Sequence, residues 1–160
     1  MIFKFYELNK IDLKNIRIFL IHGKNDGAKN TIINHIKRKV NECEKIKYTE
    51  KEILNQNDEF YNTVLNKSFF EEKKIIIVNQ VTSKIKKIFE YVSDKISDDI
   101  YLVILSDPLD KKSTLRLDFE KAKKHACIAV YPENEQTRTN HVASTFSSMA
   151  SKGEYYCTSQ

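Results

Sequence analysis

Five short apolar runs, rich in β-branched residues, constrain the fold of this chain more than any other feature. They cover residues 18–21, 46–48, 75–78, 100–105 and 127–131. Continuous apolar runs of this length are typical of strands buried on both faces of a parallel sheet. All are far shorter than the roughly 20 apolar residues that a membrane-spanning helix needs. The sequence therefore predicts a sheet of five mostly parallel strands and no membrane contact.

Helical patterns separate the apolar runs, because apolar residues recur there at spacings of three and four. Three such faces are Ile32, Ile36, Val40 and Cys43; Ile85, Ile88, Phe89, Val92 and Ile96; and Leu115, Phe119, Ala122 and Ala126. A further short helix is predicted over residues 57–66. Strands that alternate with helices give a three-layer α/β fold, with right-handed crossovers between parallel strands.

The charge balance leaves the choice of partner open. The 160 residues carry a net charge of +5, which suits a nucleic-acid partner. The composition is rich in Lys, Asn and Ile, however, and an AT-rich genome produces the same bias. Along the sequence the basic residues form no clustered stripe, and this counts against a dedicated nucleic-acid-binding protein.

The cysteines indicate a reduced, cytoplasmic protein without a metal site. Cys43, Cys127 and Cys157 are odd in number, far apart and lack metal-ligand spacing. The chain opens with no signal-peptide pattern. We therefore expect neither a disulfide framework nor a bound metal.

The sharpest local pattern begins at Gly23, directly after the first apolar run, and leads into a helical pattern. A phosphate-binding loop reads G-x-x-x-x-G-K-[ST] in this position. Gly23 and Lys29 match the pattern, and Gly27 lies inside it. Ala28 stands where the second glycine belongs, so its β-carbon hinders a backbone cradle for phosphate. Asn30 stands where a Ser or Thr hydroxyl would bind magnesium.

The third apolar run ends in Asn79 and Gln80. A phosphate-loop enzyme carries a metal-binding carboxylate at this place. We therefore interpret the loop as a relic that keeps the strand–loop–helix arrangement without the metal site, and we expect no cofactor and no ATP hydrolysis. Weak phosphate binding at the helix N-terminus through Lys29 stays open. The alternative is a divergent P-loop ATPase or kinase that uses Lys29.

Two adjacent aromatic residues, Phe69 and Phe70, follow Ser68 just before the third apolar run. Both rings could cap the core of the domain. The other interpretation is an exposed apolar plug, because aromatic pairs that enter a partner's pocket are typical binding hot spots.

Four elements in register resemble one known family. They are the eroded loop from Gly23 and the segments 68–78, 102–115 and 130–134. In this order and spacing the chain resembles the N-terminal domain of the delta subunit of the bacterial DNA polymerase III clamp loader, over about residues 15–137.

The resemblance implies a RecA-like domain of the AAA+ class that has lost nucleotide binding. In this family the residues at Phe69 and Phe70 project from the domain and enter a hydrophobic pocket on the sliding clamp, the beta subunit. This sequence has Phe-Phe where Leu-Phe is common. The implied partners are the clamp, the clamp-loader ATPase subunits and delta-prime, with DNA reached indirectly through the complex. No catalysis of its own is implied, although the subunit serves a nucleotidyltransferase holoenzyme.

The last segment differs from the rest in composition. Residues 133–160 contain no Ile or Leu, but are rich in Ser and Thr. We expect a RecA-like clamp-binding domain over residues 1–132. Residues 133–160 are then the start of a lid region or a Ser/Thr-rich tail. One hypothesis is that the reading frame changes shortly after Thr137; a native flexible tail is the other. The family's collar domain, which joins its ATPase partners, is expected to be absent from this chain.

Overall fold

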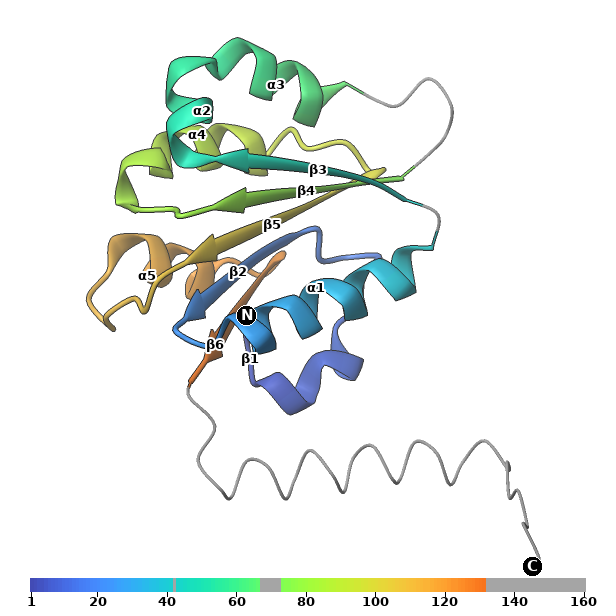
Figure 1. The fold of residues 1–160 in the computed structure, drawn as a ribbon, viewed down its shortest axis with the longest axis vertical. Helices are drawn as coiled ribbons and strands as arrows, with labels where there is room; N and C mark the ends of the chain where they lie inside the picture. The colour runs from blue at the N-terminus through green and yellow to red at the C-terminus, as the bar shows by residue number, and fades with distance from the viewer. Residues whose placement is uncertain (42, 67–72, 132–160) are drawn as a thin grey trace, which may run out of the picture.

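The computed structural model describes residues 1–41, 43–66 and 73–131. Its centre is a six-stranded sheet in the order β1-β6-β2-β5-β4-β3 (Figure 1). Every described strand pair is parallel. The strands are β1 (Ile2–Phe3), β2 (Ile18–Gly23), β3 (Cys43–Thr49), β4 (Lys73–Asn79), β5 (Ile100–Ser106) and β6 (His125–Val130). The predicted α/β fold with a mostly parallel sheet is therefore confirmed.

Helices cover both faces of the sheet and complete the three layers (Figure 1). One face carries the 3₁₀ helix η1 (Phe5–Lys10) and α1 (Asp26–Val40). The other face carries α2 (Glu50–Asn55), α3 (Asn57–Leu65), η2 (Ser83–Ile85), α4 (Lys86–Ser93) and α5 (Thr114–Lys121). Among the residues that the structure describes, no helix is long and apolar enough to cross a membrane.

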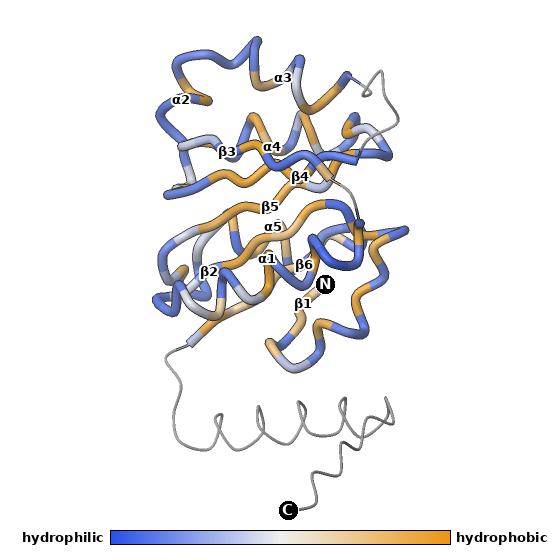
Figure 2. Tube along the Cα trace, turned by 45° about the vertical axis from the view of Figure 1, so that its right-hand side comes forward, coloured by the Kyte–Doolittle hydropathy of each residue, from blue (hydrophilic) through white to orange (hydrophobic). Residues whose placement is uncertain are grey.

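Two hydrophobic cores lie on either side of the sheet because side chains alternate along each strand. In β2, Ile18 and Leu20 face the core beneath α2 to α5, whereas Phe19 and Ile21 face the core beneath α1. Figure 2 shows the central strands β4 and β5 as largely hydrophobic. Each fully buried Ile, Leu or Phe side chain stabilises the fold by about 1.5–3 kcal/mol. The two cores therefore hold the domain together.

The sheet has six strands where five were predicted. The additional strand, β1, is two residues long and pairs Ile2 with Cys127 and Phe3 with Ile128 of β6. Two residues carry no measurable periodicity, and this strand forms only through pairing with a distant part of the chain.

Three predicted helical faces run past the true helix ends. Helix α1 ends at Val40, where Asn41 has a φ of 52°, so the predicted face wrongly included Cys43 of β3. The face that included Ala126 was wrong for the same reason, because α5 ends at Lys121 and Ala126 lies in β6. Ile96 likewise lies beyond the end of α4. Cys43 and Ala126 belong to the strand that follows their helix, whereas Ile96 lies in the connection between α4 and β5.

Candidate functional site

The candidate site begins at the carboxyl end of β2. Gly23 ends this strand with a φ of 141°, a conformation that L side chains rarely adopt. It pairs with Val130, the last residue of β6. The chain then turns through Lys24 and Asn25 into α1 (Figure 1). The predicted strand–turn–helix arrangement is present.

Helix α1 begins at Asp26, three residues before Lys29. Asn25 is its N-cap, and its side-chain oxygen Oδ1 accepts a hydrogen bond of 3.0 Å from the Ala28 amide. The Lys29 amide donates to the Asn25 carbonyl at 3.1 Å, as in an ordinary helix. Residues that form an open cradle in a phosphate loop thus form the first turn of a helix. Two amides of this turn already have partners within the chain.

The Lys29 side chain is buried, with 7% of the residue exposed. Its ammonium Nζ lies 3.2 Å from Oδ1 of Asp26, one turn earlier in the same helix. Of the other predicted loop residues, Gly27 lies in the first helical turn and its carbonyl accepts from the Thr31 hydroxyl at 3.0 Å. Asn30 is exposed on α1. The structure therefore brings Gly23, Ala28 and Lys29 to one edge of the sheet.

A buried histidine lies beside this turn and was not among the predicted site residues. His22 is 3% exposed, and its Nδ1 is 3.5 Å from the Leu109 amide. Burial, aided by the nearby charge of Arg116, lowers the pKa of His22 to about 4. The imidazole is therefore neutral at pH 7. Its position at the end of a buried strand was the only sequence signal for it.

Arg116 of α5 holds the segment that follows β5. Its guanidinium donates to the Leu109 carbonyl at 3.1 Å and to Glu120 Oε1 at 2.7 Å. The hydrogen bond to Glu120 raises the pKa of Arg116 above its ordinary value. Leu109 is thus held by His22 on one side and by Arg116 on the other, which fixes this segment at the same sheet edge.

The end of β4 lies at the same carboxyl end of the sheet. Asn79 ends the strand, and Gln80 follows with a φ of 56°. The next residue, Val81, is tied to β5, because its carbonyl accepts from the Ser106 hydroxyl at 2.8 Å. Within residues 1–41, 43–66 and 73–131, no group of three or more His, Cys, Asp or Glu could hold a metal ion.

The predicted clamp-binding residues Ser68, Phe69 and Phe70 lie outside the described residues. In sequence they stand between α3, which ends at Leu65, and β4, which begins at Lys73.

The fold and the carboxyl end of the sheet define a three-layer α/β protein, consistent with a RecA-like domain, with a strand–turn–helix at Gly23. The family model for the DNA polymerase III delta subunit matches residues 19–131. The chain therefore belongs to the DNA polymerase III delta subunit family, and its role is that of a clamp-loader subunit in DNA replication. No curated protein matches the chain.

Proposed function

We propose that this chain binds and opens the sliding clamp by contact through Ser68, Phe69 and Phe70, without hydrolysing ATP itself. The observation that carries the proposal is the family match over residues 19–131. This match spans both the turn at Gly23 and the aromatic pair. We assign the clamp-binding domain to residues 1–132.

Opening a ring requires only that the subunit binds the open clamp more tightly than the closed one, because a ligand shifts an equilibrium by its differential affinity. Burial of two aromatic side chains in a partner contributes about 1.5–3 kcal/mol each. This is enough to bias an interface within the ring. The ATPase subunits of the loader would then control access to the plug.

The contacts at the N-terminus of α1 support the absence of ATP hydrolysis. A phosphate would compete with Asn25 for the Ala28 amide and with Asp26 for the Lys29 ammonium. Unwinding the first turn of α1 would be needed to offer a cradle of free amides. Asn79 also offers an amide at the end of β4, where the metal of a phosphate-loop enzyme needs a carboxylate.

The clamp contact is tested by surface plasmon resonance with an immobilised bacterial sliding clamp. We expect the double variant Phe69→Ala, Phe70→Ala to bind about a hundredfold more weakly or worse. The matched control removes two exposed aromatic residues elsewhere, Tyr6→Ala and Tyr131→Ala, which are 65% and 68% exposed. The control should bind as the wild type does. Equal affinity of the aromatic-pair variant and the wild type would overturn the proposal.

ATP hydrolysis is tested by measuring phosphate release from radiolabelled ATP by the same protein in the presence of Mg²⁺. We expect no phosphate release above the blank, and no difference between the wild type and Lys29→Ala. Turnover by the wild type that disappears in Lys29→Ala would establish the divergent P-loop ATPase instead.

A further inference from the structure

A narrow slot of about 70 Å³ lies between α4 and α5. Its apolar lining comes from both helices and from the first residue of β2: Ile18, Phe89, Leu115, Phe119 and Ala122. The volume is several times the roughly 10–15 Å³ that a single water molecule needs. The slot can therefore take a short branched aliphatic group.

An ion pair crosses the slot near the carboxyl end of the sheet. Helices α4 and α5 each lead into a strand of the parallel sheet, so both run from its carboxyl end towards its amino end. Lys86, the first residue of α4, places its Nζ 2.6 Å from Asp118 Oδ2 and 3.7 Å from Glu90 Oε1. Both carboxylates thus already have a cationic partner, and the ion pair bounds the slot on this side.

The other end of the slot opens into a polar hollow of about 220 Å³. The two spaces share Ile18, Ser93 and His125 in their linings, so they adjoin. The segments that precede β2 and β6 add the basic residues Lys14, Arg17 and Lys124 to the polar hollow. An apolar space and a polar space thus meet at the amino end of the sheet.

Arg17 is held in place by contacts within the chain. Its guanidinium lies 3.6 Å from Asp98 Oδ1 and donates to the Lys14 carbonyl at 3.4 Å. It also lies over the Tyr101 ring, 5.4 Å from the ring centroid. The pair with Arg17 therefore balances the charge of Asp98 in the lining of the polar hollow.

Two lysines in the polar hollow keep their charges available. Lys14 and Lys124 are exposed, and neither pairs with a carboxylate in the part of the chain that the structure describes. Asp94 also lines the hollow, so two ammonium groups are set against one unpaired carboxylate. The remaining charge is positive, and each ammonium can donate up to three hydrogen bonds. This end of the site suits an anionic group.

His125 stands where the slot and the polar hollow meet. Its ring packs against Phe119, with the ring centroids 5.1 Å apart. Among the described residues, its imidazole nitrogens have no hydrogen-bond partner. Burial lowers the pKa of His125, so the ring is neutral at pH 7. One nitrogen can therefore donate a hydrogen bond to a ligand.

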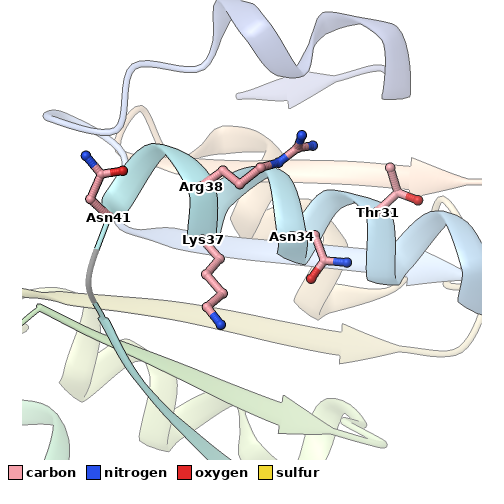
Figure 3. A pocket seen from close by; sticks show the side chains of 5 residues that line it. All are labelled: Thr31, Asn34, Lys37, Arg38 and Asn41. Atoms are coloured by element: carbon pink, nitrogen blue, oxygen red, sulfur yellow. The ribbon is translucent and has the colours of Figure 1, made fainter. Parts of the chain in front are cut away.

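The larger hollow on the outer surface of α1 lacks this combination. It measures about 680 Å³, and the five side chains that line it are all polar (Figure 3). A ligand there would gain no apolar burial, and its polar contacts would replace contacts with water. The slot between α4 and α5 differs because it joins an apolar wall to unpaired cations.

We infer that the slot and the polar hollow together bind a small carboxylic acid with a branched aliphatic chain, and we call them the α4–α5 site. The chain occupies the slot against Phe89 and Phe119, and the carboxylate reaches Lys14 and Lys124. The slot admits one aliphatic group, whereas a protein partner would need a far broader surface. The inference does not depend on the proposed clamp contact, because the α4–α5 site uses no residue of the segment 68–70.

The test is nuclear magnetic resonance titration of the isotope-labelled full chain with isocaproate. We expect saturable shifts of the amide signals of Ser93, Ala122 and His125. Two control ligands separate the contributions. Acetate has the carboxylate without the branched chain, and isopentylamine has a branched chain with the opposite charge. Acetate should bind about tenfold more weakly or worse, because several buried carbons are lost. Isopentylamine should bind about fivefold more weakly or worse, because the lysines repel it.

Two variants test the two halves of the site. Ala122→Leu places a branched group in the slot from the end of α5 and should abolish the saturable shifts. The double variant Lys14→Ala, Lys124→Ala should weaken isocaproate binding about fivefold. The matched control Lys111→Ala, Lys112→Ala removes the same charge from exposed positions outside the site and should bind as the wild type does.

Circular dichroism should show all variants folded. Unchanged isocaproate binding by folded Ala122→Leu would overturn the inference. The same holds for equal affinities of isocaproate and isopentylamine, and for a wild type that shows no saturable shift. Equal weakening by the two lysine variants would mean that bulk charge attracts the acid, and would also count against the α4–α5 site. Clamp affinity is measured separately, so each of these failures leaves the proposed function standing.

Discussion

Gly23 and Val130 approach so closely that a β-carbon on Gly23 would lie 1.7 Å from the Val130 carbonyl oxygen. The two residues are paired at the carboxyl ends of β2 and β6. The φ of 141° at Gly23 is itself unfavourable for any residue with a side chain. Both the backbone angle and the neighbouring strand therefore require glycine at this position.

Gly23→Ala should lower the free energy of unfolding by about 3 kcal/mol or more, because strain at φ adds to the displacement of a backbone carbonyl. Urea unfolding followed by circular dichroism measures this loss.

Gly27→Ala is the matched control, since Gly27 lies in the first turn of α1 and an added β-carbon would meet only the Asn25 oxygen at 3.4 Å. This change should raise stability by about 0.5–1 kcal/mol. If both variants proved equally stable, the close approach of β2 and β6 would be wrong.

Because the pKa of His22 is lowered in the folded state, the protein should be less stable in acid. Burial lowers its pKa to about 4 in the folded state, against 6.5 for an ordinary histidine. The unfolded chain therefore binds more protons between these values, and stability falls as the pH drops through this window. The expected contribution between pH 7 and pH 5 is about 2 kcal/mol. Urea unfolding at the two pH values measures it.

His22→Asn is the informative comparison, because asparagine keeps an acceptor near the Leu109 amide and does not titrate. His35 and His125 also have lowered pKa values through burial, so wild type and variant will both weaken in acid. The difference between them isolates His22. Identical pH dependence of the two proteins would contradict the assignment.

The predicted strands agree with the structure where burial alone determines them. Ile75 to Val78 and Ile100 to Leu105 are apolar without alternation because helices cover both faces of the sheet. Helix α2 was missed although its start carries a sequence signal: Thr49 and Glu52 form a capping box. Its six residues are too few for a periodic pattern. The edge strand at Ile2 depends on a partner more than 120 residues away, which no local pattern reveals.

Glu50 of α2, on the face of the sheet opposite α1, stabilises the fold through its contact with Thr82. It is 8% exposed; its carboxylate accepts a bond of 2.7 Å from the Thr82 hydroxyl, and a further bond from the Thr82 amide. Glu50→Ala should lower the free energy of unfolding by about 1.5–3 kcal/mol, since hydrogen bonds to a charged group are lost. Lys51→Ala, at the neighbouring exposed position, should change stability little. Comparable losses in the two variants in urea unfolding would contradict this role.

The cysteines should differ in reactivity. Burial raises the pKa of the Cys127 thiol to about 11, and the charge of Glu120 adds to the shift. Only the thiolate attacks alkylating reagents, so Cys127 should stay unmodified by iodoacetamide in the folded protein and react in urea. Cys43 is half-buried and should be modified first of the two. Peptide mass mapping after timed alkylation separates the sites. Early modification of Cys127 would show that β6 is open to solvent.

The loop pattern predicted where the candidate site lies, but not how its atoms are arranged. Gly23 and Lys29 follow directly from the motif spacing. The early start of α1 at Asp26 depends on the capping hydrogen bond of Asn25, which competes with an open loop by a small free energy.

The position of the first residue of α1 also determines what a conversion of the Gly23 turn into a phosphate-binding loop would require. Ala28→Gly with Asn30→Thr would restore the letters of the motif, but Asn25 would still close the helix and Asp26 would still hold the lysine. Such a conversion would further require melting one helical turn and placing an acid at Asn79. Several changes, each without benefit alone, separate this domain from a working nucleotide pocket. Under the proposed function the domain acts through its surfaces, and no step of that function requires these changes.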